Sequence, residues 1–229
     1  GRPRYGAEGE LFAGEGRVYF GLSLERDVSR RRLSGPRRSV RTWVSVIAVY
    51  DLGYLAPGRW TPDTHLGGEA GVGLREARAP DRQGDLEGSV GFDTQGRLFA
   101  RGSATAEASV ALPRGWTAGV RGYAAGVIDY VEGGRWGEDA PRERQVFLAG
   151  ADPYEALSNP WIRSAGALLD DEGLIPGGGG LVGYHPGLAF AQLVSFTAEA
   201  RTPALVRLVA GSRVEARGRV FGGVALGPT

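Results

Sequence analysis

The chain has 229 residues, enough for one sizeable β domain, and contains 39 glycines, 13 prolines and 42% hydrophobic residues. No apolar run approaches the roughly 18 consecutive residues of a membrane-spanning helix, so a helical span is excluded. All 27 basic residues are Arg, Cys is absent and the formal net charge is +1. This composition excludes disulfides and thiolate metal sites and offers no broad basic field for nucleic acid.

Apolar and polar residues alternate along most of the chain, which is the pattern of β-strands with two different faces, and no segment of any length has a helical period. The expected strands are residues 5–13, 17–27, 40–51, 66–78, 84–93, 97–112, 116–130, 143–150, 191–202 and 205–226. Because 205–226 is long enough for one strand or two, the count is about ten or eleven. The sequence begins without Met or a signal peptide and stops after a strand-like segment, so we expect a piece of a longer polypeptide.

The clearest alternation lies in residues 97–131, which we expect to form one long hairpin. Even positions from Leu98 to Leu112 are apolar and odd positions are largely polar, and the pattern resumes from Trp116. A three-residue loop at 113–115, with Gly115 in the left-handed conformation, keeps all apolar residues on one face. This register pairs Gly102 with Gly126, Ala108 with Val120, and Glu107 with Arg121 in a favourable cross-strand charge pair.

The apolar face of these strands indicates a lipid environment. The two strands run to about 15 residues, whereas strands of globular proteins cluster near 5–6. A soluble core favours large side chains, but this face is mostly Ala, Gly and Val, which a lipid-facing surface tolerates. Aromatic residues at or near strand ends resemble interfacial girdles: Tyr54, Trp60, Trp116, Tyr130 and Trp136. A soluble sandwich or a β-solenoid, with these aromatics packed at its rim, is the alternative.

Few residues offer catalytic or ligand chemistry. The only histidines are His65 and His185, neither at a recognisable catalytic or metal-ligand spacing, so we expect no enzyme activity, cofactor or metal site. A barrel-embedded hydrolase using a Ser and His185 is the alternative. The loop 28–39 carries five arginines, which form either a solvated loop or a contact with lipopolysaccharide phosphates: Arg30, Arg31, Arg32, Arg37 and Arg38.

The connection 151–190 has about forty residues, and connections of this length are usually functional or disordered. It contains a glycine run, which permits left-handed backbone and close approach to other parts of the chain. Its glycine-rich motif consists of Gly177, Gly178, Gly179, Gly180, Leu181, Val182, Gly183 and Tyr184. A strand ending Glu199-Ala200-Arg201-Thr202-Pro203 follows, and then the segment 221–227. Together these resemble the bacterial surface antigen superfamily of outer-membrane barrels, with Val182 in place of the family's loop Arg and Gly223 in place of its Asp.

The resemblance implies that residues 1–229 form part of an all-β, antiparallel up-and-down transmembrane β-barrel in the bacterial outer membrane. Loop 151–190 would be extracellular and fold into the lumen. By strand parity, loop 28–39 would lie on the same side, and connections 52–65 and 132–142 would be periplasmic. The implied function is membrane insertion or translocation of unfolded protein substrates, with outer-membrane lipid as the other partner. A passive or ligand-specific channel and a soluble β-rich adhesin are the alternatives.

Overall fold

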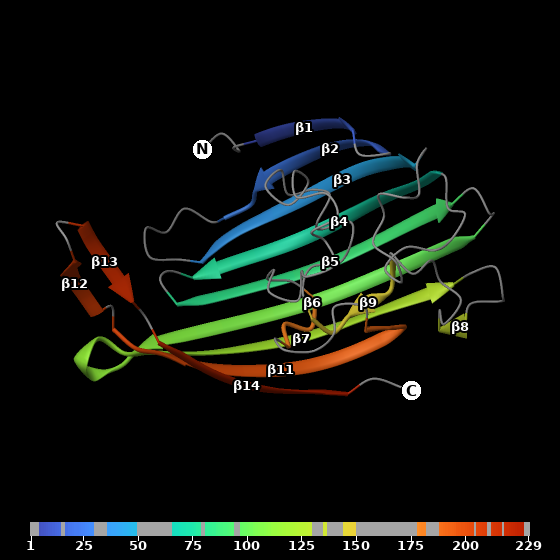
Figure 1. Ribbon diagram of the computed structural model, residues 1–229. Coiled ribbons are helices and arrows are strands. Elements are labelled where there is room, and N and C mark those ends of the chain that lie inside the picture. The colour runs from blue at the N-terminus through green and yellow to red at the C-terminus, as the bar shows by residue number, and fades with distance from the viewer. Residues whose placement is uncertain are drawn as a thin grey trace.

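The computed structural model describes residues 5–14, 17–29, 36–49, 66–78, 81–93, 97–129, 135–136, 144–149, 178–181, 188–203, 205–209, 212–216 and 218–226. Nine of the described strands form one antiparallel sheet in the order in which they occur in the chain (Figure 1). They are β1 (Tyr5–Gly14), β2 (Arg17–Asp27), β3 (Arg37–Val49), β4 (Leu66–Arg78), β5 (Arg82–Asp93), β6 (Leu98–Ala111), β7 (Thr117–Asp129), β11 (Gln192–Arg201) and β14 (Arg219–Leu226). None of the described helical segments is long and apolar enough to cross a membrane.

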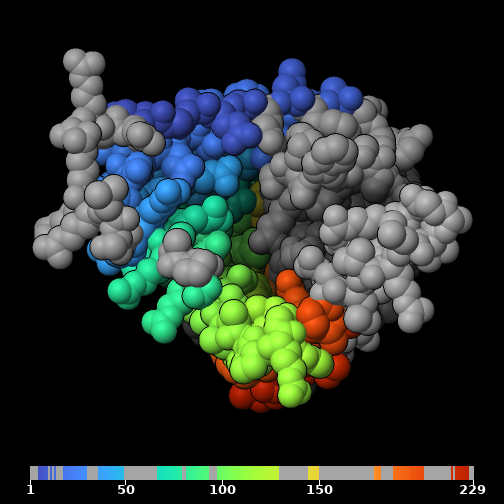
Figure 2. All heavy atoms as spheres, turned by 90° about the vertical axis from the view of Figure 1, so that its left-hand side faces the viewer, coloured from blue at the N-terminus to red at the C-terminus, as the bar shows by residue number. Residues whose placement is uncertain are grey.

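The predicted all-β meander is therefore confirmed. Within the described residues, β1 pairs only with β2 and β14 only with β11, so the two edges of the sheet are not joined. Viewed from the end where β1 starts, the strands curve around a hollow, with β1 and β2 above and the β6–β7 hairpin below (Figure 2). The closed barrel that the resemblance implies is a further step, which we take up as a proposal.

The β6–β7 hairpin has the register predicted from its alternation. Gly102 pairs with Gly126, Ala108 with Val120, and Glu107 with Arg121, whose Nε lies 3.1 Å from the Glu107 carboxylate. Residues 113–115 form a short 3₁₀ turn in which Gly115 has φ of 77°, as predicted. Arg114 is also left-handed, at φ of 63°, a conformation that is uncommon for residues other than Gly and that the alternation pattern does not predict.

Alternation separates two faces in every strand of the sheet. The inner face carries the buried residues, among them Tyr19, Ile47, Phe99, Tyr123 and Ser195. The outer face carries nearly all large apolar residues that are exposed: only Val28, Leu188 and Phe221 in that exposed set lie elsewhere. The sheet is thus apolar where it meets its surroundings and mixed polar and apolar on its inner face, the reverse of a soluble β domain.

One predicted strand, and part of a second, are not in the wall of the sheet. Segment 143–150 contributes only the two-residue β9 (Val146–Phe147), which pairs with β10 (Ala189–Phe190) against the inner face. Segment 205–226 is neither one strand nor two: it forms a separate hairpin, β12 (Leu205–Val209) with β13 (Ser212–Ala216), followed by β14. Figure 1 shows this hairpin beyond the end of the sheet. The two-residue β8 (Arg135–Trp136) pairs with β7.

Because segment 143–150 is not a wall strand, the number of wall strands between the connections differs from the prediction. The ends of the sheet at which the connections lie therefore change. The connection 28–36 lies at the end of the sheet where β2 ends and β3 begins, with the turns 79–81 and 112–116. The connections 50–65 and 130–191 lie at the opposite end. The expectation that loop 28–39 shares an end with loop 151–190 is therefore wrong. We call these two ends the short-turn end and the long-connection end.

Candidate functional site on the inner face

Two described parts of the long connection between β7 and β11 lie against the inner face, and we call them the inner segments: residues 144–149 and 178–181. They are joined to each other by main-chain hydrogen bonds. Gly179 N–H donates to Phe147 O at 2.9 Å and Leu181 N–H donates to Leu148 O at 3.2 Å. Leu148 N–H donates to Leu188 O at 2.9 Å, which ties the inner segments to the residues that lead into β11. Segments more than thirty residues apart in the chain therefore form one unit.

Apolar side chains fix this unit to the centre of β7 and β11. Val146, Leu148 and Leu181 are buried in a cluster with Tyr123 of β7 and Leu193 of β11. The run 146–149 is apolar at every position, and all four side chains are buried. A continuous apolar run of this length is typical of a segment covered on both sides, which distinguishes it from the wall strands with their one polar face.

A buried ion pair fixes the other side of the unit to β4. The guanidinium of Arg144 contacts the Glu69 carboxylate, and the two side chains are 2% and 8% exposed. The same guanidinium carbon lies 4.8 Å from the centroid of the Phe99 ring on β6. A charge buried this deeply requires an opposite charge nearby, so Arg144 and Glu69 are positioned by each other.

Glycine is required where the inner segments touch the wall. Gly180 has φ of 70°, and a Cβ there would lie 2.6 Å from Nη1 of Arg121. A Cβ on Gly179 would lie 2.7 Å from Leu148 O and 2.8 Å from the Leu193 side chain. The close approach allows Arg121 Nη2 to donate to Gly178 O at 2.8 Å and Ser195 Oγ to donate to Gly179 O at 2.6 Å. The described glycines, Gly178 to Gly180, therefore allow the backbone to dock closely against the wall.

A charged cavity of about 480 Å³ opens on the inner face of β1 to β5. Arg75 Nε lies 2.6 Å from the Asp85 carboxylate, and Glu25 is directly opposite Arg41 across the β2–β3 pair. The charged side chains of its lining are Glu8, Glu25, Arg41, Arg75, Asp85 and Glu87. Four carboxylates and two guanidinium groups in this cavity form a polar surface on the inner face.

The sequence-predicted site residues have three different outcomes. Gly178, Gly179, Gly180 and Leu181 lie on the inner face, where the resemblance places the loop motif, while Gly177, Val182, Gly183 and Tyr184 lie outside the described residues. Arg30, Arg31, Arg32, His65 and His185 also lie outside them. Arg37 and Arg38 begin β3 at the short-turn end.

Sequence reasoning missed the residues that hold the inner segments. Arg144 and Glu69 are far apart in the chain, and Ser195 looked like an ordinary polar-face residue. The one available signal was the apolar run 146–149, which differs from the alternating wall strands.

Comparison with protein-family models, with curated proteins and with solved structures found no match.

Proposed function

We propose that this chain forms the wall of a bacterial outer-membrane β-barrel that inserts or translocates protein substrates. The observation that carries the membrane placement is the outer face of the sheet. From Leu24 on β2 to Leu226 on β14, this face has no charged side chain among the described residues, apart from those at the short-turn end. We call this surface the apolar band.

The apolar band is exposed across the whole sheet rather than gathered in one patch. Leu22 on β2 is 49% exposed, Val90 on β5 is 60% exposed and Val194 on β11 is 57% exposed. Monomeric soluble proteins rarely expose contiguous apolar patches beyond a few hundred Å². An apolar surface of this extent is unfavourable in water. It is favourable against the hydrocarbon core of a membrane, because the apolar side chains there contact lipid and not water.

The edges of the sheet add a condition to this proposal. Unpaired backbone N–H and C=O groups cost several kcal/mol each in a bilayer, so β1 and β14 need hydrogen-bond partners there. Eight successive antiparallel pairings make β1 and β14 run in the same direction. Direct closure of these nine strands would thus join the edges in parallel, and antiparallel closure requires an odd number of added strands.

The inner face supports passage of a polypeptide. The docked unit covers the centre of β7 and β11, and the charged cavity on the same face offers both carboxylates and guanidinium groups to a hydrophilic chain. The motif resemblance to the bacterial surface antigen superfamily favours protein substrates over small solutes. The same open cavity of about 480 Å³ favours the second candidate, a channel for small polar solutes with the inner segments as its constriction.

The membrane placement is tested by refolding the chain from urea into a neutral detergent. We expect a β-rich circular dichroism spectrum and an unboiled band that migrates faster than the boiled one on a denaturing gel. Cooperative folding in buffer alone, with no dependence on detergent, would overturn the proposal and favour the soluble adhesin.

The two candidate functions separate in planar bilayers. A protein-translocating barrel is expected to show conductance that an added unfolded outer-membrane protein blocks. A solute channel is expected to show conductance that the polypeptide leaves unchanged and that a permeating sugar or amino acid reduces.

A further inference from the structure

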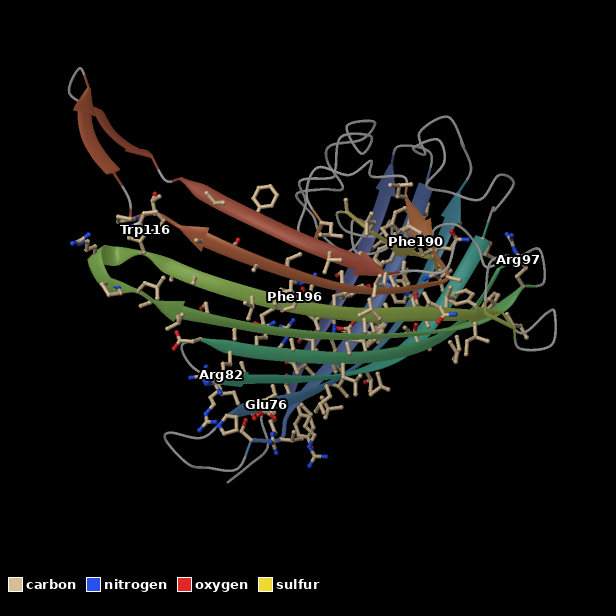
Figure 3. The ribbon with its side chains drawn as sticks, turned by 90° about the horizontal axis from the view of Figure 1, so that it is seen from below. Glu76, Arg82, Arg97, Trp116, Phe190 and Phe196 are labelled. Atoms are coloured by element: carbon tan, nitrogen blue, oxygen red, sulfur yellow. The ribbon has the colours of Figure 1, made fainter. Side chains whose placement is uncertain are left out.

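Four arginines of four different strands border the apolar band at the short-turn end, and we call them the arginine rim: Arg26, Arg38, Arg78 and Arg82. Their registers place all four on the outer face. Arg26 lies opposite Val40, Arg38 opposite Glu76, and Arg78 opposite Arg82. Figure 3 shows Arg82 and Glu76 together at this end of the sheet, far from Arg97 at the other end.

The arginine rim has more positive charge than its neighbours neutralise. Arg38 Nε lies 2.7 Å from the Glu76 carboxylate in an exposed pair. Arg26 lies over the Tyr5 ring, at 5.7 Å from its centroid. Arg78 and Arg82 have no acidic partner within the described part of the chain, although Asp81 lies in the turn between their strands. Four guanidinium groups therefore face two carboxylates.

The Arg78–Arg82 pair is the most informative contact. Like charges directly opposite each other on an antiparallel pair are destabilising, because the two side chains are held side by side. Both arginines are exposed, and on the outer face only the Glu76–Gly84 pair lies between them and the apolar pair Leu74 and Leu86. An anion between the two groups would turn repulsion into two attractive contacts, and guanidinium groups bind phosphate in bidentate fashion.

We propose that the arginine rim binds the phosphodiester headgroups of anionic glycerophospholipids in the leaflet at the short-turn end. This inference rests on the proposed membrane placement, which makes that leaflet the periplasmic one because the β3–β4 and β7–β11 connections leave the opposite end, and outer-membrane barrels have their longer loops on the extracellular side. It differs from the predicted lipopolysaccharide contact of loop 28–39, which required the opposite leaflet.

The outer-face residues between Arg82 and the apolar band are small, so the acyl chains of such a lipid can lie against them. Arg82 lies opposite Ala108, and the next outward pair is Gly84 with Ala106. A Cβ on Gly84 would make only an ordinary van der Waals contact, with Thr105 O at 3.7 Å. Small residues therefore line the path from the headgroup position into the apolar band, while Leu74 and Leu86 border it.

Native mass spectrometry of the refolded full chain in neutral detergent tests this site. The probes are phosphatidylglycerol and phosphatidylcholine, added at equal concentration. We expect the wild type to retain phosphatidylglycerol in preference to phosphatidylcholine. The R78Q/R82Q double variant is expected to lose that preference by about tenfold or more, the size of one charge-assisted contact. Arg97→Gln, at the long-connection end, is the matched control and is expected to behave like the wild type.

Three results would overturn the lipid site: equal retention of both lipids by the wild type, an unchanged preference in R78Q/R82Q, or an equal loss in Arg97→Gln. If the double variant does not refold, Arg82→Gln alone tests the site: it is expected to lose part of the preference, and an unchanged preference would overturn the proposal. A chain that refolds in detergent without lipid preference would overturn this inference and leave the proposed function standing. A chain that does not need detergent would overturn both.

Discussion

Two substitutions to arginine, one on each face of the same strand and made separately, would distinguish a lipid-facing sheet from a soluble one. Ala104 and Ser103 are neighbours in β6, where Ala104 is on the outer face and Ser103 on the inner face opposite Glu87. Ala104 is the seventh residue of a strand of 14, so roughly 20 Å of strand lies on either side of it. An arginine at this depth is too far from either interface for its side chain to reach water easily.

The expected magnitudes follow from this placement. Arginine at the bilayer midplane of a barrel's lipid face costs about 2–4 kcal/mol, which is about 30- to 700-fold in the folding equilibrium. Ala104→Arg is therefore expected to lose this much stability. Ser103→Arg is expected to change stability by less than about 0.5 kcal/mol, because its guanidinium enters the polar inner face beside a carboxylate.

The assay is urea unfolding of both variants and the wild type in phosphatidylcholine vesicles, followed by tryptophan fluorescence. The reasoning would be refuted if Ala104→Arg were as stable as the wild type. It would also be refuted if the larger loss belonged to Ser103→Arg, since that result assigns the lipid to the other face.

Three further predictions concern the inner segments. Glu69→Gln leaves the buried Arg144 charge uncompensated and is expected to lower the free energy of unfolding in urea by about 3–5 kcal/mol. Glu107→Gln, in a half-exposed pair, is the control and is expected to lower it by less than about 1 kcal/mol. Equal losses would contradict the burial of the Arg144–Glu69 pair. Gly180→Ala is expected to cost about 1–3 kcal/mol and to speed proteolysis of the long connection, because its φ is 70°. Gly122→Ala, whose Cβ meets nothing within 4 Å, is the control, and an equal effect of both would refute the docking argument. Arg144→Ala is expected to raise single-channel conductance, and unchanged conductance would show that the inner segments do not obstruct a pore.

The register and the faces of the sheet could be predicted because both are local properties. Alternation with a period of two assigns each residue of β6 to a face, and one charge pair, Glu107 with Arg121, rejects the slipped register. The left-handed Gly115 follows from the loop length that this register demands. The structure has all of these features.

The place of segment 143–150 could not be predicted from alternation, because the wall and the inner layer are distinguished only by distant contacts. Arg144 meets Glu69, a residue 75 positions away, and nothing near either residue in the sequence indicates the other. Counting 143–150 as a wall strand then reversed the expected end of loop 28–39. One misplaced strand reverses the side of every connection before it relative to every connection after it, since each wall strand crosses the sheet once.

The corrected parity also removes a difficulty in the membrane interpretation. Connections 52–65 and 132–142 were expected at the periplasmic end, where they are longer than barrel turns usually are. In the structure, β3 ends and β4 begins at the same end of the sheet at which β7 ends and β11 begins, whereas β4 and β5, β6 and β7, and β11 and β14 are each connected at the other end. The arginine rim lies at this second end. The longest connections at one end, and the arginines proposed to bind phosphate at the other, therefore favour the same orientation in the membrane, one that neither feature alone would establish.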